Sequence, residues 1–231
     1  GCFPRGFVAP VVIVQHMPKN FTSYLAKRLD SRCALNVKEA EDGVVVRPGD
    51  VWIAPGDVHI KLRRRRDDVR IETDDGGLVN SCRPSVDVLF ESVAQSHGSA
   101  ALAVVLTGMG QDGLNGSRSI AEAGGRVIAQ DQGSSVVWGM PGLVAAGGLA
   151  DTVLPCSEIG PEIVFDSPTV PAGIGSPRRI HLLIQTVFGG QTSEIQKLLE
   201  NRRHHTRQNK PNGIRVDELA SPVADRDPAF A

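Results

Sequence analysis

The sequence predicts an α/β domain with a mostly parallel, doubly wound sheet, helices on both of its faces and a β-hairpin insertion. Two segments, VVIV at 11–14 and ALAVVL at 101–106, are apolar at every position. Such strands are typical of parallel sheets that are covered on both sides. Segments with helical spacing of apolar residues alternate with the strands along the chain, as βαβ units require.

The first helix is expected directly after the first strand. In FTSYLAKRL, Phe21, Leu25 and Leu29 recur at i, i+4 and i+8 and would share one helical face. From about residue 35 to 73, short β-rich pieces separated by Pro-Gly-Asp and Gly turns predict hairpins. The four arginines at 63–66, followed by two aspartates, are expected at a solvent-exposed hairpin tip.

The second half continues the alternation of helices and strands. RPSVDVLFESVAQ predicts a helix with Pro84 at its first position and an apolar stripe that includes Val86 and Phe90. The strand ALAVVLT follows, and then the Gly-rich turn GMGQDG at 108–113 and a helix at about 114–123. The strand RVIAQ and a short helix after GMPG complete the pattern.

A segment rich in Pro, Gly and Ser after residue 165 predicts a domain boundary. We expect one domain at 1–165, and a linker and partly disordered tail at 166–231. Within this tail, IHLLIQTVFGGQTSEIQKLL has the outline of a strand, a Gly-Gly turn and a helix.

The composition bears on partners and location. The formal net charge is -1, so no overall charge favours nucleic acid or an anionic membrane. No apolar run approaches the roughly 20 residues of a membrane-spanning helix, and no signal-peptide pattern is found. The four cysteines lie far apart without a C-x-x-C pair, which predicts neither a metal site nor a disulfide framework. We expect a cytoplasmic protein with no cofactor, no metal, no nucleic-acid partner and no membrane insertion.

His16 and Asp112 are the candidate catalytic residues. Each follows an apolar strand, and ligands and catalytic groups gather at the carboxyl ends of parallel strands. Asp112 precedes a helix whose first amides would keep its carboxylate ionised and lower its pKa. A His–Asp pair could then remove a proton from a hydroxyl nucleophile, which the sequence itself does not identify.

The Gly-rich turn at 108–113 allows two other interpretations. It satisfies G-x-G-x-x-G between a strand and a helix, which is the fingerprint of a dinucleotide-binding protein, and Asp131 lies where the ribose acid would be. Against this, the carboxylate of Asp112 would compete with a pyrophosphate for the same amides. Alternatively, Asp112 only caps the helix.

Seven segments, in order along about residues 8 to 165, resemble one family. They are QHMPKNFTSYLAKRLD, VKEAEDG, PGDVWIAPGDVHI, RPSVDVLFESVA, VVLTGMGQDG, VIAQDQGSSVVWGMPG and GGLADTVLP. They are similar to the catalytic domain of bacterial chemotaxis protein-glutamate methylesterases, the CheB family. The resemblance implies a parallel α/β domain that hydrolyses glutamate methyl esters on the cytoplasmic helices of methylated chemoreceptors. Many members also deamidate receptor glutamines.

The resemblance also implies roles for three residues. His16 matches the histidine of the family's catalytic triad, Asp112 matches its aspartate, and Met109 matches a methionine at the rim of the substrate site. The family's first strand ends in a Gly-x-Ser-Thr-Gly-Gly turn that carries the nucleophile, and this motif is absent from the sequence. We therefore expect a catalytic domain that is incomplete at its N-terminus, without its nucleophile strand and without the receiver domain of family members.

The missing strand is central in the family, so its loss would leave backbone donors and acceptors unpaired inside the sheet. The resemblance gives none of Ser85, Ser134 and Ser135 the nucleophile's role. The tail could fill the slot as a permuted strand, although Val187 and Phe188 stand where serine and threonine should be. The chain is thus expected to be a methylesterase, and the alternatives are a non-catalytic receptor-binding remnant or a dinucleotide-binding protein.

Overall fold

The structure is a computed structural model that describes residues 3–4, 7, 9–66, 68–166 and 180–185, the last six by their backbone only. Helices and strands alternate along most of this part of the chain. They are β1 (Val11–Gln15), α1 (Phe21–Asp30), β2 (Asn36–Glu39), β3 (Asp50–Ile53), β4 (His59–Arg65), β5 (Asp68–Asp74), α2 (Val86–His97), a 3-10 turn (Gly98–Ala100), β6 (Ala101–Val105), α3 (Leu114–Glu122), β7 (Arg126–Gln130), α4 (Met140–Ala146), β8 (Thr152–Leu154), α5 (Cys156–Asp166) and β9 (Ile180–Gln185).

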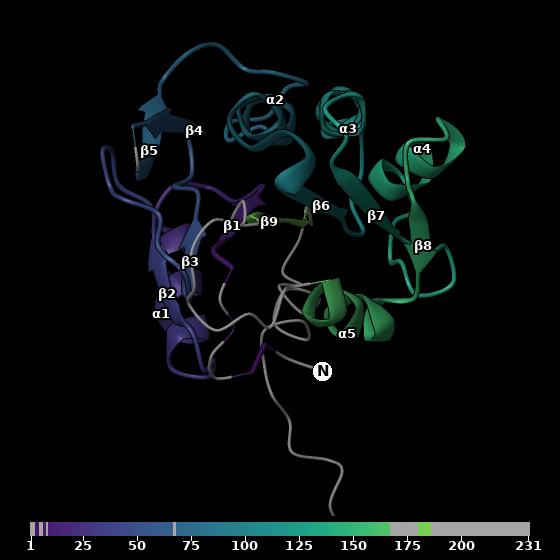
Figure 1. The fold of residues 1–231 in the computed structure, drawn as a ribbon, viewed down its shortest axis with the longest axis horizontal. Coiled ribbons are helices and arrows are strands. Elements are labelled where there is room, and N and C mark those ends of the chain that lie inside the picture. The colour runs from purple at the N-terminus through teal and green to yellow at the C-terminus, as the bar shows by residue number, and fades with distance from the viewer. Residues whose placement is uncertain (1–2, 5–6, 8, 67, 167–179, 186–231) are drawn as a thin grey trace, which may run out of the picture.

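Seven strands form one parallel sheet in the order β2-β3-β1-β9-β6-β7-β8 (Figure 1). β4 and β5 form a separate antiparallel hairpin. The predicted α/β class with a hairpin insertion is therefore confirmed. The prediction of hairpins throughout 35–73 is wrong for β2 and β3, which pair in parallel with each other. Residues 51–53 of β3 are buried on both faces, as in a strand inside a parallel sheet.

Helices cover both faces of the sheet (Figure 1). Val12 and Val14 of β1 belong to the apolar core beneath α2, α3 and α4. Val11 and Ile13, which point the opposite way, belong to the core that contains α1 and α5. Successive side chains of a strand alternate between faces, so a sheet with two covered faces needs apolar residues at every position. This requirement explains VVIV in the sequence.

The buried face of α1 differs from the predicted one. Leu25 and Leu29 are buried as expected, whereas Phe21 is 59% exposed. The buried stripe begins at Thr22 and continues through Leu25, Ala26 and Leu29, which recur at i, i+3, i+4 and i+7. The three-residue pattern used for the prediction therefore identified the helix but placed one residue on the wrong face.

The start of α2 also differs from the prediction. Pro84 precedes the helix instead of opening it, because Ser85 has extended backbone angles of φ -109° and ψ 141°. Val86 is the first helical residue, and both Val86 and Phe90 are fully buried, as predicted. The displaced start leaves the amides of the first turn of α2 facing the carboxyl edge of the sheet.

β9 lies between β1 and β6 and runs parallel to both. Its residues 181–185 pair with 11–15, and residues 180–184 pair with 101–105. The unpaired backbone expected in the middle of the sheet therefore has partners in the structure. β9 comes from the predicted tail and takes the position proposed for a permuted strand. The rest of the predicted linker and tail, with Val187 and Phe188, lies outside the described residues, and the domain boundary at 165 stays a prediction.

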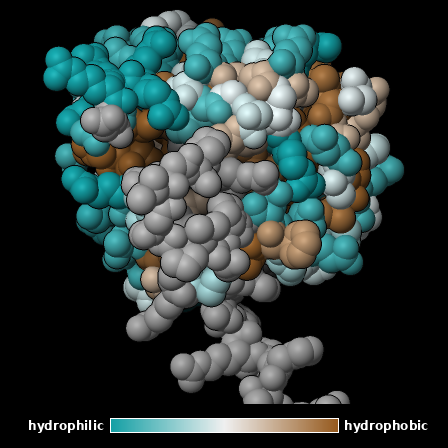
Figure 2. All heavy atoms as spheres, viewed as in Figure 1, coloured by the Kyte–Doolittle hydropathy of each residue, from teal (hydrophilic) through white to brown (hydrophobic). Residues whose placement is uncertain are grey.

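The β4–β5 hairpin has one apolar and one charged side. Ile60, Leu62 and Ile71 join the core beneath α2. The arginines at 63–66 are exposed near the tip, as predicted, and Figure 2 shows hydrophilic residues gathered over this corner of the molecule. Among the described residues, no helix is both long and apolar enough to cross a bilayer.

Candidate active site

His16 lies at the carboxyl edge of the sheet, directly after β1. The chain turns sharply there, because the Met17 N–H donates to Gln15 O at 2.8 Å. The turn packs against the loop after β3 at Gly56, where a Cβ atom would lie only 2.7 Å from Met17 O and Lys19 N. Only glycine permits this approach, so the position of His16 depends on it.

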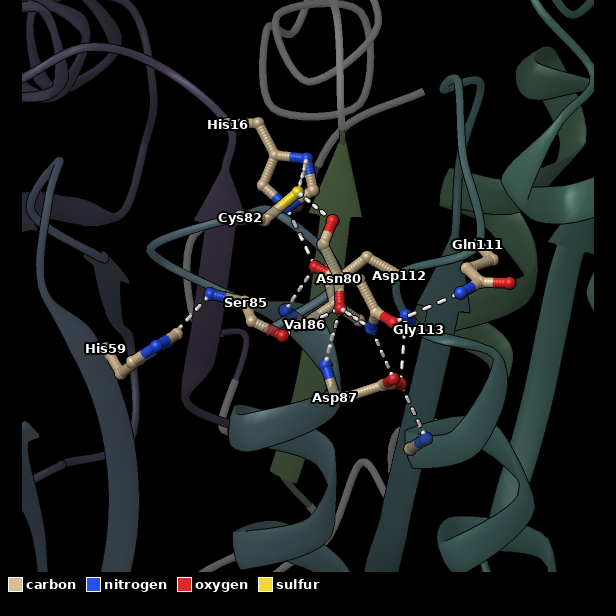
Figure 3. A network of polar contacts seen from close by, with 11 residues as sticks. His16, His59, Asn80, Cys82, Ser85, Val86, Asp87, Gln111, Asp112 and Gly113 are labelled. Carbon is tan, nitrogen blue, oxygen red and sulfur yellow. Dashed lines mark hydrogen bonds and ion pairs between the residues drawn. The ribbon is translucent and has the colours of Figure 1, made fainter. Parts of the chain in front are cut away.

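Asp112 lies in the loop between β6 and α3, and its side chain meets that of His16. Asp112 Oδ2 is 2.9 Å from His16 Nε2, although the two residues are 96 positions apart (Figure 3). The side chains are 2% and 9% exposed, respectively. The fold thus brings together the two residues that the sequence selected as candidates.

The carboxylate of Asp112 is bound by five donors. Burial raises its pKa, but the hydrogen bonds from His16, Ser85, Val86 and Asn80 outweigh burial and lower it. The direction of this shift is the predicted one, and it favours the ionised carboxylate. The donors are the backbone N–H groups of Val86 (2.7 Å) and Asp87 (3.2 Å), Ser85 Oγ (2.7 Å), Asn80 Nδ2 (3.0 Å) and His16 Nε2 (2.9 Å).

These backbone amides belong to α2, not to α3 as predicted. Gly113, with φ 92°, separates Asp112 from the helix that follows it. The amides of α3 are bound instead by Asp87, whose Oδ1 accepts the N–H groups of Gly113 at 2.9 Å and Gly116 at 2.7 Å. Each helix therefore begins against a carboxylate from the segment of the other, which satisfies amides that have no partner within their own helix.

The pKa of Asp87 is shifted in the opposite direction to that of Asp112. Burial raises the pKa of Asp87, and the nearby negative charge of Asp112 raises it further. The hydrogen bonds from Gly116, Asn80 and Gly113 act against this rise without cancelling it. Asn80 Nδ2 lies between the two acids, since it donates to Asp87 Oδ2 at 2.7 Å and to Asp112 Oδ1 at 3.0 Å.

Glycine allows α2 and α3 to lie close enough for the carboxylate of each segment to bind the amides of the other. A Cβ atom on Gly116 would lie 2.5 Å from Phe90 Cβ and 3.1 Å from Asp87 Cα. A Cβ atom on Gly113 would lie 2.8 Å from Val86 Cγ1. Gly113 and Gly116 therefore permit the close packing of the two helices.

The segment before α2 brings Cys82 against the His16 ring. Val79 and Cys82 exchange backbone hydrogen bonds of 3.1 and 2.9 Å, and Asn80 and Ser81 between them have positive φ angles. Cys82 Sγ lies 3.7 Å from His16 Nδ1. His16, Cys82 and Asp112 form a group whose potential metal-ligand atoms all lie within 4.8 Å of one another.

Sequence reasoning missed Asn80, Cys82 and Asp87. The sequence carries only local signals for them, namely an Asn suited to a turn and an acid in the first turn of a helix. Neither signal points to a contact with His16 or Asp112, since these lie far away in the chain.

The three serines considered as nucleophiles have other hydrogen-bond acceptors. Ser85 is fully buried and donates to Asp112 Oδ1. Ser134 Oγ donates to Asp131 Oδ1 at 2.5 Å, and Ser135 Oγ donates to Asp131 O at 2.6 Å. Their hydroxyl groups therefore serve local structure.

The geometry also argues against a dinucleotide at the Gly-rich turn. The amides of Gly113 and Gly116, which would receive a pyrophosphate, are already bound by the carboxylate of Asp87. Asp131, the proposed ribose acid, accepts hydrogen bonds from Ser134. Met109, in the same turn as Asp112, is 63% exposed.

Comparisons with known proteins identify a family for this chain. Residues 1–163 match the family described as CheB methylesterase. A protein of Trichodesmium erythraeum named protein-glutamate methylesterase/protein-glutamine glutaminase is 57% identical over 162 residues, which are 70% of this chain and 46% of that protein. A Caulobacter vibrioides protein named protein-glutamate methylesterase/protein-glutamine glutaminase 2 is 49% identical over 165 residues, or 71% and 48% of the two chains.

A solved structure is similar as well. The crystal structure of the Thermotoga maritima CheB methylesterase catalytic domain matches with a TM-score of 0.69 and 46% sequence identity, over 71% of this chain and 86% of that one. The chain spans less than half the length of the two curated relatives described above.

Proposed function

Because this chain belongs to the CheB methylesterase family, we propose that it hydrolyses the methyl esters of glutamate side chains on the cytoplasmic helices of chemoreceptors. The observation that carries the proposal is the contact between His16 Nε2 and an Asp112 carboxylate that is held in its ionised form. Such a pair can activate a hydroxyl nucleophile for attack on an ester.

The proposed roles follow from which ring nitrogen meets the acid. Asp112 accepts the Nε2–H of His16, which orients the ring and stabilises the imidazolium ion. Nδ1 is then the nitrogen that takes the proton of a hydroxyl nucleophile and later returns a proton to the leaving methoxide. Water releases the glutamate carboxylate by the same route. Met109, exposed beside Asp112, would contact the receptor.

Deamidation of receptor glutamines is the second proposed reaction. The relatives carry both activities in their names. A primary amide offers the same carbonyl carbon as a methyl ester, and the proton from His16 would go to departing ammonia instead of methanol. One His–Asp pair therefore suits both substrates.

The hydroxyl nucleophile is the part that the described residues do not supply. His16 and Asp112 follow β1 and β6, which are the two neighbours of β9 in the sheet. A nucleophile placed just after β9 would thus come from the strand between them. In the sequence, Val187 and Phe188 occupy the positions of Ser and Thr before Gly-Gly.

Methanol release from methylated chemoreceptor, measured with the purified chain, tests the proposal. We expect Asp112→Asn to lower any turnover by roughly 10⁴-fold, as replacement of a triad aspartate does in serine hydrolases. A double substitution, Val187→Ser with Phe188→Thr, is expected to raise methanol release above that of the unchanged chain. The matched control, Ser134→Ala, should leave the rate unaltered.

Val187 and Phe188, which stand before Gly-Gly where Ser and Thr would supply a hydroxyl group, favour a second candidate, a receptor-binding remnant without catalysis. Receptor binding without methanol release, from both the unchanged chain and the double variant, would support the remnant and contradict the esterase. Release of methanol from the unchanged chain would exclude the remnant, whereas release from the double variant alone would show that the unchanged chain lacks only its nucleophile.

A further inference from the structure

Asn80 lies between the two acids of the site, in the turn before α2 (Figure 3). Its side-chain Nδ2 donates to Asp112 Oδ1 at 3.0 Å and to Asp87 Oδ2 at 2.7 Å. An amide nitrogen has two N–H groups, so one group can serve each acid. The backbone at Asn80 has a φ of 51°, in the left-handed region that asparagine adopts more readily than most residues. Backbone hydrogen bonds between Val79 and Cys82 close the turn, which therefore presents the amide to both acids.

Asn80 helps to fix the plane of the Asp112 carboxylate. Oδ1 of this acid accepts three hydrogen bonds, from Asn80 Nδ2, Ser85 Oγ and the N–H of Asp87. Oδ2 faces His16 Nε2 at 2.9 Å. Because Oδ1 is held in place, the carboxylate cannot turn freely about its Cβ–Cγ bond, and Oδ2 stays against the imidazole ring.

The same amide separates two carboxylates that repel each other. Burial and the charge of Asp112 raise the pKa of Asp87. Burial acts in the same direction on Asp112, whereas the hydrogen bond from Asn80 lowers the pKa of both acids. The other donors to Asp87 are the backbone N–H groups of Gly113 and Gly116, which carry no full charge. Without the amide, the two carboxylates would repel each other directly, and Asp112 could turn away from the imidazole ring.

Cys82 and His59 also lie near this network. The Cys82 thiol donates to Asn80 O at 3.4 Å, and burial raises its pKa to about 11, so it is uncharged at neutral pH. His59 Nδ1 accepts the N–H of Ser85 at 3.0 Å, so the ring nitrogen on this side carries a lone pair instead of a proton. Neither of these groups offers the two acids a positive charge in place of the amide.

We propose that Asn80 is a positioning residue for the His16–Asp112 pair. Its amide keeps the carboxylate of Asp112 turned toward His16 Nε2 and separates it from the carboxylate of Asp87. Asp87 in turn anchors the amide through the shorter of its two hydrogen bonds. The effect on turnover rests on the function proposed above, because a ring without a fixed acid loses the orientation and tautomer that a general base needs. The positioning itself does not depend on that function, so the two can be tested apart.

NMR of the ¹⁵N-labelled full chain tests the positioning without reference to activity, and His16→Gln identifies the signals of His16. In the unchanged chain we expect the neutral ring to carry its proton on Nε2. Asn80→Gly permits the same positive φ, and Asn80→Asp keeps the size but cannot donate once it is ionised. Each should shift roughly a fifth or more of the neutral ring to the Nδ1–H tautomer. The matched control Ser81→Gly, at an exposed residue of the same turn with a φ of 62°, should keep the Nε2–H tautomer.

A titration of the side-chain carboxyl groups, followed by ¹³C NMR, gives a second readout. The pKa of Asp112 should rise in both Asn80 variants, because each lacks a donor that stabilises the ionised acid, and should stay unaltered in Ser81→Gly. An unchanged tautomer and an unchanged pKa of Asp112 in both Asn80 variants would overturn the proposal. Normal behaviour of Asn80→Asp beside an altered Asn80→Gly would also overturn it, since size and backbone would then matter and the donor would not.

Methanol release tests the consequence for turnover. In whichever chain releases methanol, unchanged or with Val187→Ser and Phe188→Thr, Asn80→Asp should lower kcat by about tenfold or more and leave KM within about twofold. Ser81→Gly should change neither. An unaltered kcat in Asn80→Asp would contradict the role in turnover. A chain that never releases methanol would contradict the proposed function, whereas the NMR measurements would still decide whether Asn80 positions the pair.

Discussion

Two regions of the molecule hold acidic side chains in close polar contacts, but the acids are buried in one region and exposed in the other. At the start of α2 and α3, Asp87 and Asp112 are 3% and 2% exposed and are held mainly by N–H and hydroxyl donors. On the β4–β5 hairpin, Arg63 and Glu72 pair at 2.9 Å with both side chains 46% exposed.

The two regions differ in whether water or the protein solvates the carboxylates. An exposed ion pair competes with solvation and salt, so its net contribution is small. A buried carboxylate has lost its water and must be bound by the protein, and removing it leaves its donors unsatisfied. Proximity of charges is therefore a poor guide to stability without burial.

The largest effect is expected at Asp112. Asp112→Ala would leave the hydroxyl of Ser85 and the amides of Val86 and Asp87 without this acceptor, and should lower the free energy of unfolding by about 3 kcal/mol or more. Urea unfolding measures this loss. Asp112→Asn, which keeps one oxygen acceptor, should lose clearly less. A loss below about 1 kcal/mol for the alanine variant would contradict the importance of the network.

Gly116→Ala should have the next largest effect. The added Cβ atom would lie 2.5 Å from Phe90 Cβ and force α2 and α3 apart, at a cost of about 1–3 kcal/mol. Gly77→Ala is the matched control, since a Cβ atom there has no other atom within 4 Å. Thermal unfolding of both variants measures the difference, and equal melting temperatures would show that the helices can separate without cost.

Asp87→Asn is expected to cost about 1 kcal/mol at neutral pH, because its amide cannot accept the hydrogen bond from Asn80. The cost should depend on pH. The pKa of Asp87 is raised above 3.8 by burial, so between 3.8 and the raised value the folded state binds a proton that the unfolded state lacks. The unchanged chain therefore gains stability as pH falls through this window, and Asp87→Asn does not.

Urea unfolding at a series of pH values measures the gap between the two proteins. The gap should widen as pH falls from neutral toward 3.8. Asp112 has a lowered pKa and loses its own contribution only as pH falls below 3.8, so it adds no pH dependence within this window. A gap that narrows on acidification would reverse the sign assigned to Asp87.

The smallest effect is expected on the hairpin. Arg63→Gln should change the free energy of unfolding by less than about 0.5 kcal/mol at physiological salt, because both partners are half exposed. A double-mutant cycle with Glu72→Gln isolates the coupling between the two side chains. A coupling above about 1 kcal/mol would mean that this surface pair behaves like the buried network.

The fold class followed from periodicity because each β-strand and helix meets its packing requirement locally. VVIV must be buried on both faces, and Val86 and Phe90 recur at helical spacing, so both elements could be predicted. The parallel pairing of β2 with β3 could not, because short strands separated by turn residues look alike whether their neighbour is near or far in the chain. The position of β9 between β1 and β6 could be stated only as one possibility, because the sequence of a strand does not show which strands it pairs with.

In the candidate site, too, some residues could be predicted from the sequence and others could not. His16 and Asp112 could be selected from the sequence because each is a polar residue that follows an apolar strand, and the carboxyl ends of parallel strands share one edge. Cys82, Asn80 and Asp87 could not, since their contacts depend on where the segment before α2 is placed.

By itself, the sequence indicated most of the strands and helices, the two candidate catalytic residues and the ionised state expected of Asp112. Tertiary structure alone decided which helix supplies its amides, which face of His16 meets Cys82, and which strand lies between β1 and β6. The reason is physical: hydrophobic periodicity is a property of neighbouring residues, whereas hydrogen bonds between distant segments depend on backbone directions that only the packed chain establishes.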